Sequence, residues 1–178
     1  IGLDMFLGED APWYARVGMP AYAGIRCERH QILPACAARL ADRHLIPSVQ
    51  DDLIGAMLQE GRRLYFMESL LPSLPEQTLA AYTSGQLEWC HTQEENLWGF
   101  LVDNELFYSK DAQMVNQMMQ DGPFTNAFGK DSPPRLGQWL GWQVVRSFME
   151  SHRDVRLDSL MRMDNAHLLF RESGYRPR

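Results

Sequence analysis

The stretch SVQDDLIGAMLQEGRRLYFMESLL, residues 48–71, decides the fold of this chain. Its apolar side chains recur at the spacing of one face of an α-helix, so it predicts a long helix that buries this face in a core. We expect Ser48 to be the N-cap, with Asp51 and Asp52 near the positive end of the helix dipole. Pro72 and Pro75 end the helix. The buried face consists of Leu53, Met57, Leu64, Met67 and Leu71.

A carboxylate, that of Glu60, falls on this apolar face. Moving a bare carboxylate out of water is costly unless the group is paired, hydrogen-bonded, metal-bound or protonated. Gly61 follows it in the helix interior, where glycine costs roughly 1 kcal/mol relative to alanine. We therefore expect Glu60 to have a partner, and Gly61 to mark a close approach by another backbone or a side chain.

The expected partners are Arg135 and Arg146, in a helix predicted from Pro134 to about His152. The planar guanidinium group of arginine can satisfy a buried carboxylate through two hydrogen bonds. Arg146 shares a stripe of this helix with Trp139, Trp142 and Met149. A structural link between Glu60 and arginine is favoured over a catalytic role, and Glu60→Ala is then predicted to lower stability by roughly 3 to 5 kcal/mol.

The other patterns are helical except at the N-terminus. Residues 1–8 alternate between apolar and other positions, which predicts a short β-strand. A lone strand is unstable, so we expect it to belong to a larger sheet completed by a missing N-terminal part or by another chain. The predicted fold class is thus mainly α, of the α+β type. Further helices are predicted at residues 33–44, 84–108, 111–120, 156–162 and 164–173, the last capped by Asp164.

Composition indicates one ordinary domain, residues 1–178, with 45% hydrophobic residues. A formal net charge of −6 argues against nucleic acid or an anionic membrane surface as the main partner. No apolar stretch has the length of a transmembrane span. Because the chain starts at Ile1, inside the predicted strand, we expect an upstream part to be missing. The three cysteines have neither disulfide-framework nor zinc-ribbon spacing.

Catalytic motifs are not found in the sequence. It contains no H-E-x-x-H pair of zinc ligands, no G-x-S-x-G nucleophile turn and no phosphate-binding glycine loop. Zinc remains possible but is disfavoured, and no other cofactor is indicated.

Several segments together resemble the gliding-motility lipoprotein GldB family of Bacteroidetes, and the resemblance covers nearly the whole chain. They are IGLDMFLG (1–8), LQEGRRLYFMESLL (58–71), QLEWC (86–90), NELFYS (104–109), GPFT (122–125) and SPPRLGQWLGWQVVRSFM (132–149). That family is in turn similar to predicted zinc proteases with a zincin-like fold, in which an H-E-x-x-H helix precedes a helix whose E-G pair supplies the third metal ligand.

Glu60 and Gly61 match that E-G pair, whereas residues 33–44 read LPACAARLADRH in place of the zinc-binding motif. The resemblance therefore implies a zincin-like scaffold without its catalytic part, which acts by binding protein partners of the cell envelope. It also implies a role in gliding and its linked secretion machinery, and a lipid anchor upstream. The alternative is a zinc metallopeptidase with a non-standard ligand set, in which His30 or His44 replaces a missing ligand. A third hypothesis is an interaction module that docks a partner through the loop from Trp13 to Tyr22 or through the Met-rich helix.

Overall fold

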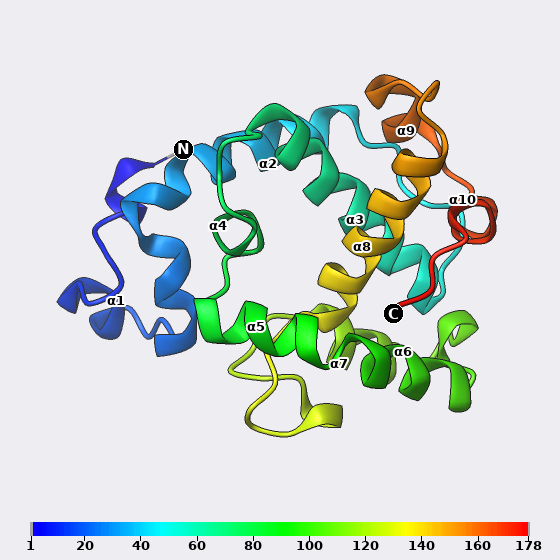
Figure 1. Ribbon diagram of the computed structural model, residues 1–178. Coiled ribbons are helices and arrows are strands. Elements are labelled where there is room, and N and C mark those ends of the chain that lie inside the picture. Colours follow the sequence, from blue (N-terminus) through cyan, green and yellow to red (C-terminus); the bar gives the residue numbers. More distant parts are fainter. Residues whose placement is uncertain (1, 178) are drawn as a thin grey trace.

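Two central helices organise the computed structural model, which describes residues 2–177 (Figure 1). Helix α3 spans Leu53–Leu70 and helix α8 spans Leu136–Ser151, and they pack against each other along much of their length. Where they cross, a Cβ atom added to Gly61 would lie 2.3 Å from the carbonyl oxygen of Gly141. One added to Gly141 would lie 2.0 Å from that of Met57. The close approach expected at Gly61 is confirmed.

Helix α3 is capped by Asp52, not by Ser48 as predicted. The Asp52 carboxylate accepts a hydrogen bond of 2.9 Å from the backbone N–H of Gly55, and its other oxygen lies 2.6 Å from Nε2 of His167. The Ser48 hydroxyl instead accepts a bond from the backbone N–H of Gln50. Ser48 thus stabilises the turn that precedes the helix, and the helix starts only after Asp52.

Smaller helices surround this central pair. Helices α2 and α10 pack on α3, and α7 and α10 pack on α8. Side chains from α2 to α10 form a continuous hydrophobic cluster, in which Trp139 and Trp142 are the largest. The remaining helices are α1 (Pro12–Arg16), α2 (Ile32–His44), α4 (Glu76–Ala80), α5 (Ser84–Thr92), α6 (Glu94–Asp103), α7 (Ala112–Met119), α9 (Leu157–Arg162) and α10 (Ala166–Ser173). Short 3-10 helices cover Leu3–Met5, Ala21–Cys27, Arg29–Gln31, Leu106–Tyr108 and Asn126–Phe128.

The predicted N-terminal strand is wrong. Leu3–Met5 forms a 3-10 turn, in which the backbone N–H of Met5 donates to the carbonyl of Gly2, and residues 2–177 contain no strand. Ile1, where the predicted strand started, lies outside the described residues. Alternation over so few residues does not require a sheet, and Gly8, with φ of +101°, turns the chain toward Cys27.

The helix predicted over residues 84–108 is divided into α5, α6 and a 3-10 turn. The first break is at Gln93, where φ is −106° and ψ is 9°. The second is at Glu105, which adopts a left-handed conformation with φ of +53°. The last helix is capped by the side chain of Asn165 instead of Asp164. Among the helices of residues 2–177, none combines the length and the apolarity that crossing a bilayer requires.

Candidate functional site

Glu60 lies at the edge of α3, with 25% of its side chain exposed. Its carboxylate accepts a hydrogen bond of 3.3 Å from Arg63, and Nε of Arg63 donates to Asp42 on α2 at 2.8 Å. The expected pairing of Glu60 with Arg135 or Arg146 is therefore wrong. The partner of Glu60 is instead Arg63, one turn further along the same helix.

Arg146 pairs with two other carboxylates. Glu68 accepts hydrogen bonds of 3.0 and 2.8 Å from it, and Glu76 lies 3.1 Å away. Burial lowers the pKa of Arg146, but the hydrogen bond to Glu68 and the charges of both carboxylates outweigh this, so its pKa is raised.

Both tryptophans of the predicted stripe join this cluster. The indole N–H of Trp142 donates to Glu68 at 2.8 Å, and that of Trp139 donates to Glu76 at 3.0 Å. The guanidinium group of Arg146 also lies 3.9 Å from the centre of the Trp142 ring.

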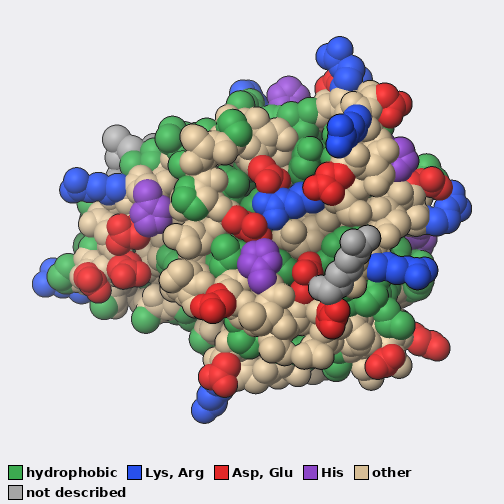
Figure 2. All heavy atoms as spheres, viewed as in Figure 1, with side chains coloured by type: hydrophobic (Ala, Val, Ile, Leu, Met, Phe, Trp, Pro, Cys, Tyr) green, Lys and Arg blue, Asp and Glu red, His purple; other side chains and the backbone are tan. Residues whose placement is uncertain are grey.

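On the face shown in Figure 2, acidic and basic side chains are interspersed and do not form a patch of one sign.

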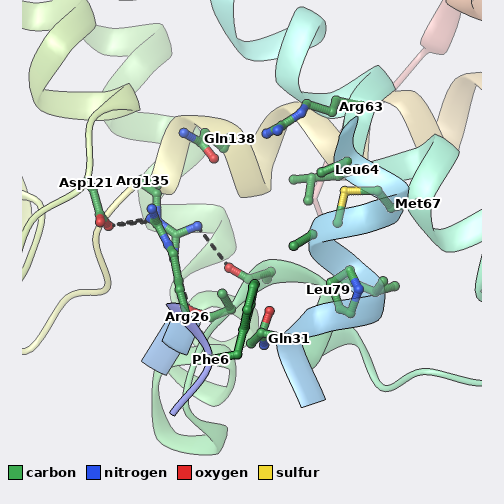
Figure 3. Close-up of a pocket in the computed structure, with 15 residues that line it drawn as sticks. Phe6, Arg26, Gln31, Arg63, Leu64, Met67, Leu79, Asp121, Arg135 and Gln138 are labelled. Atoms are coloured by element: carbon green, nitrogen blue, oxygen red, sulfur yellow. Dashed lines mark hydrogen bonds and ion pairs between the residues drawn. The ribbon is translucent and has the colours of Figure 1, made fainter. Parts of the chain in front are cut away.

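A cavity of about 510 Å³ adjoins Arg63. It lies between α2, α3, α4 and the start of α8, and the N-terminal segment contributes to its wall (Figure 3). Its volume is within the range of ligand-binding pockets. The polar residues of its lining are Gln31, Gln138, Asp121 and three arginines, Arg26, Arg63 and Arg135.

Arg135 is the most buried of the three arginines that line this cavity, with 12% of its side chain exposed. Its two terminal nitrogens donate to the carbonyls of Ala80 and Ala81, each at 3.0 Å. Its Nε lies 3.2 Å from a carboxylate oxygen of Asp121 but makes no hydrogen bond to it, so a buried donor has no acceptor among the described residues. Arg135 precedes α8 in a left-handed conformation, with φ of +59°.

Arg26 competes with Arg135 for the same carboxylate. Its guanidinium group lies 2.6 Å from the Asp121 oxygen that also faces Arg135. Figure 3 shows the two guanidinium groups next to each other, with Arg63 across the cavity. Burial and the neighbouring charge of Arg135 lower the pKa of Arg26, because both disfavour a second cation there.

The surroundings of Glu60 do not fit a zinc ion. Its hydrogen-bond partner is a guanidinium group, and within residues 2–177 no group of three or more His, Cys, Asp and Glu side chains is arranged to hold a metal. The ring of His44, one of the suggested replacement ligands, stacks on Phe66. Helix α2, where the zinc-binding motif would lie, buries Pro34, Ala37 and Ala38.

The cavity residues were mostly missed at the sequence level. Arg135 was singled out, but as a partner of Glu60, and no pattern drew attention to Arg26, Arg63 or Asp121. The signal for Arg63 was its place one turn after Glu60, where a helix brings two side chains together.

Comparison with known proteins identifies the family. The model of the family described as gliding motility protein GldB matches residues 1–177. No curated protein and no solved structure matches the chain. Because the family match spans almost the entire sequence, the chain belongs to the gliding motility protein GldB family.

Proposed function

We propose that this chain is a non-catalytic component of the cell envelope that works in gliding motility and its linked secretion machinery by binding other proteins. The observation that carries the proposal is the family match over residues 1–177. A match of this extent includes both central helices and every wall of the cavity.

The chemistry of the cavity supports binding. Guanidinium groups, side-chain amides and apolar side chains line it, and these hold a ligand by charge, hydrogen bonds and burial. Arg63 connects the cavity wall to Glu60, the residue that the resemblance marks as a former metal ligand. A guanidinium group at that carboxylate neutralises it without a metal ion.

The proposal includes the origin of the scaffold. We take α2 and α3 to correspond to the two metal-binding helices of a zincin-like protease that has lost catalysis. Support comes from the Glu60–Gly61 pair on α3, from the packing of α2 against α3, and from the small apolar side chains that α2 buries. Gly61 is retained in this view because the crossing of α3 and α8 needs it.

A lipid anchor in a segment upstream of Ile1 is also part of the proposal, and the lipoprotein label of the family supports it. Fractionation of the source organism tests this point. We expect the protein in the membrane fraction of the envelope, released by detergent and labelled by a radioactive fatty acid. Recovery in the cytoplasm without label would contradict the anchor.

Gene deletion and complementation test the function. Deletion in the source organism should abolish colony spreading, and both the wild-type gene and Glu60→Gln should restore it. Glu60→Gln keeps the size of the side chain but removes the charge that a metal site or general base requires. A folded Glu60→Gln protein that fails to restore spreading, together with near-stoichiometric zinc that depends on Glu60, would overturn the proposal in favour of a zinc metallopeptidase.

A further inference from the structure

The lining of the cavity between α2, α3, α4 and α8 contains three arginines, Arg26, Arg63 and Arg135, and one carboxylate, that of Asp121. Arg26 and Arg135 face a single carboxylate, that of Asp121, and the terminal nitrogens of Arg135 bind uncharged carbonyl groups. Arg63 is different, because Asp42 and Glu60 already neutralise it. Among residues 2–177, Arg26 and Arg135 thus share one carboxylate, and the buried Nε of Arg135 has no acceptor.

A buried donor without an acceptor is costly, and an anion that enters the cavity would supply one. The pKa of Arg26 is lowered, since burial and the charge of Arg135 both act against its protonated form. A second anion beside Asp121 would give each of the two guanidinium groups a partner of its own. A carboxylate fits this requirement, and its two oxygens suit the planar donors of a guanidinium group.

The rest of the lining has the character of a peptide site. Leu64, Met67 and Leu79 supply an apolar wall across the cavity from Arg26 and Arg135. The side-chain amide nitrogens of Gln31 and Gln138 donate to the backbone carbonyls of Thr78 and Met119. The amide oxygens of both glutamines are then available to accept hydrogen bonds, and a peptide backbone offers N–H groups whereas a free phosphate or a lipid tail does not.

We propose that this cavity binds a carboxylate of a peptide, with Arg26 and Arg135 holding the anion and with Leu64, Met67 and Leu79 covering an adjacent apolar side chain. The ligand assignment rests on the proposed function, because it takes the chain to bind a protein. The carboxylate is either a chain terminus or an acidic side chain, and the experiment separates these two sources.

Three short peptides serve as probes in a titration followed by heteronuclear NMR of the folded chain. They are acetyl-Gly-Ala-Leu with a free carboxyl terminus, the same peptide as its amide, and acetyl-Leu-Glu-Gly amide. We expect at least one of the two carboxylate peptides to shift the signals of the cavity residues, and the neutral amide to bind at least tenfold more weakly. Binding of the first identifies a chain terminus, and binding of the third identifies an acidic side chain.

The variant Arg26→Gln should weaken the binding of the carboxylate peptide at least tenfold. Arg26 is suited to this test because 42% of its side chain is exposed, so its replacement leaves the core intact. Arg171→Gln is the matched control, since Arg171 is exposed and its ion-pair partner within residues 2–177 is the adjacent Glu172. It removes the same charge and should leave the affinity unchanged. Circular dichroism verifies that both variants are folded.

Several results would overturn the assignment. These are equal binding of the neutral amide, unchanged affinity in Arg26→Gln, no binding of either carboxylate peptide, or occupation of the cavity by inorganic phosphate or phosphatidylglycerol vesicles but not by peptides. Colony spreading does not enter this measurement. A failed titration therefore leaves the role in gliding intact, and a deletion strain that still spreads leaves carboxylate binding intact.

Discussion

The two carboxylates of α3 lie in different surroundings. Glu68 accepts two hydrogen bonds from Arg146 and one from the indole N–H of Trp142. Glu60 accepts one long bond from Arg63, which is also paired with Asp42. Charge-assisted pairs with two parallel bonds are the stronger kind, whereas partly exposed single pairs contribute little. Glu68 should therefore contribute more to the stability of the fold than Glu60.

Alanine substitution of each residue tests this difference. Glu60→Ala should lower the free energy of unfolding by about 1 kcal/mol or less, in place of the 3 to 5 kcal/mol that a fully buried pair would cost. Glu68→Ala should lower it by roughly 2 to 3 kcal/mol, because it leaves the Trp142 N–H without its acceptor and Arg146 without its two-bond partner, with Glu76 as the carboxylate that remains. Urea unfolding followed by tryptophan fluorescence measures both. Equal losses would show that Glu60 is paired as strongly as Glu68.

At the level of single residues, the sequence indicated several side chains of the core but not which of them contact each other. Gly61, Arg146 and Trp142 have structural roles at the contact of α3 and α8, and Trp139 donates to Glu76 on α4. The wrong pairing of Glu60 has a physical reason. Helical periodicity places a side chain on a face, but it does not set the register between two packed helices, and an arginine can reach carboxylates on several turns.

The crossing of α3 and α8 depends on two glycines that face each other. With Cβ positions 2.3 and 2.0 Å from opposing carbonyl oxygens, neither Gly61 nor Gly141 tolerates a side chain unless a helix moves. Backbone atoms of a packed helix cannot rotate away as a flexible side chain can. The short distance between the axes of the two central helices therefore requires glycine at both positions.

Gly141→Ala should therefore destabilise the protein strongly, by about 3 kcal/mol, because the helices must separate along their shared interface. The matched control is Gly99→Ala on α6, where an added Cβ meets nothing within 4 Å. That substitution should stabilise by about 0.5 to 1 kcal/mol, since alanine is the better helix former. Urea unfolding of both variants provides the comparison. A loss in Gly99→Ala similar to that in Gly141→Ala would contradict a specific role for the crossing.

Helices were predictable where a long stripe and clear stop signals coincide, as in α2, α3, α7 and α8. The predictions that were wrong concern elements whose bounds are set by local backbone geometry. Neither the break at Gln93 nor the left-handed Glu105 has a glycine or proline to announce it. The N-terminal alternation was too short to distinguish a strand from a turn, because a few apolar residues satisfy both periods.

The cavity is a property of the whole molecule. Its charged groups come from a 3-10 helix (Arg26), from α3 (Arg63), from the loop before α8 (Asp121) and from the residue that opens α8 (Arg135). No local pattern relates these positions, and only the packing of the helices brings them together. For this reason the sequence indicated the family and the main helices but not the candidate site.

Tyr82 connects the segment after α4 with the start of α8. Its ring is buried, its hydroxyl donates to the carbonyl of Pro134 at 2.6 Å, and the guanidinium group of Arg135 lies 5.0 Å from the centre of the ring. Burial raises the pKa of Tyr82 well above its ordinary value of 10.0, although the positive charge of Arg135 acts in the opposite direction. The phenol is therefore kept neutral in the fold, and its deprotonation is coupled to unfolding.

This coupling predicts a loss of stability in alkali. Above about pH 10 the unfolded chain releases the Tyr82 proton while the folded chain retains it, so the free energy of unfolding falls by up to about 1.4 kcal/mol per pH unit. Below about pH 10, Tyr82 is protonated in both the folded and the unfolded chain, so this loss of stability does not occur. Burial also raises the pKa of Cys90 and of Tyr175, which adds to the decline, whereas it lowers the pKa of Arg62 to about 10, which acts in the opposite direction. Urea unfolding at about pH 8, 10 and 11 should give Tyr82→Phe a shallower decline than the wild type, whereas Tyr108→Phe, at an exposed ring, should match the wild type. Identical slopes for Tyr82→Phe and the wild type would show that the buried phenol does not link the fold to pH.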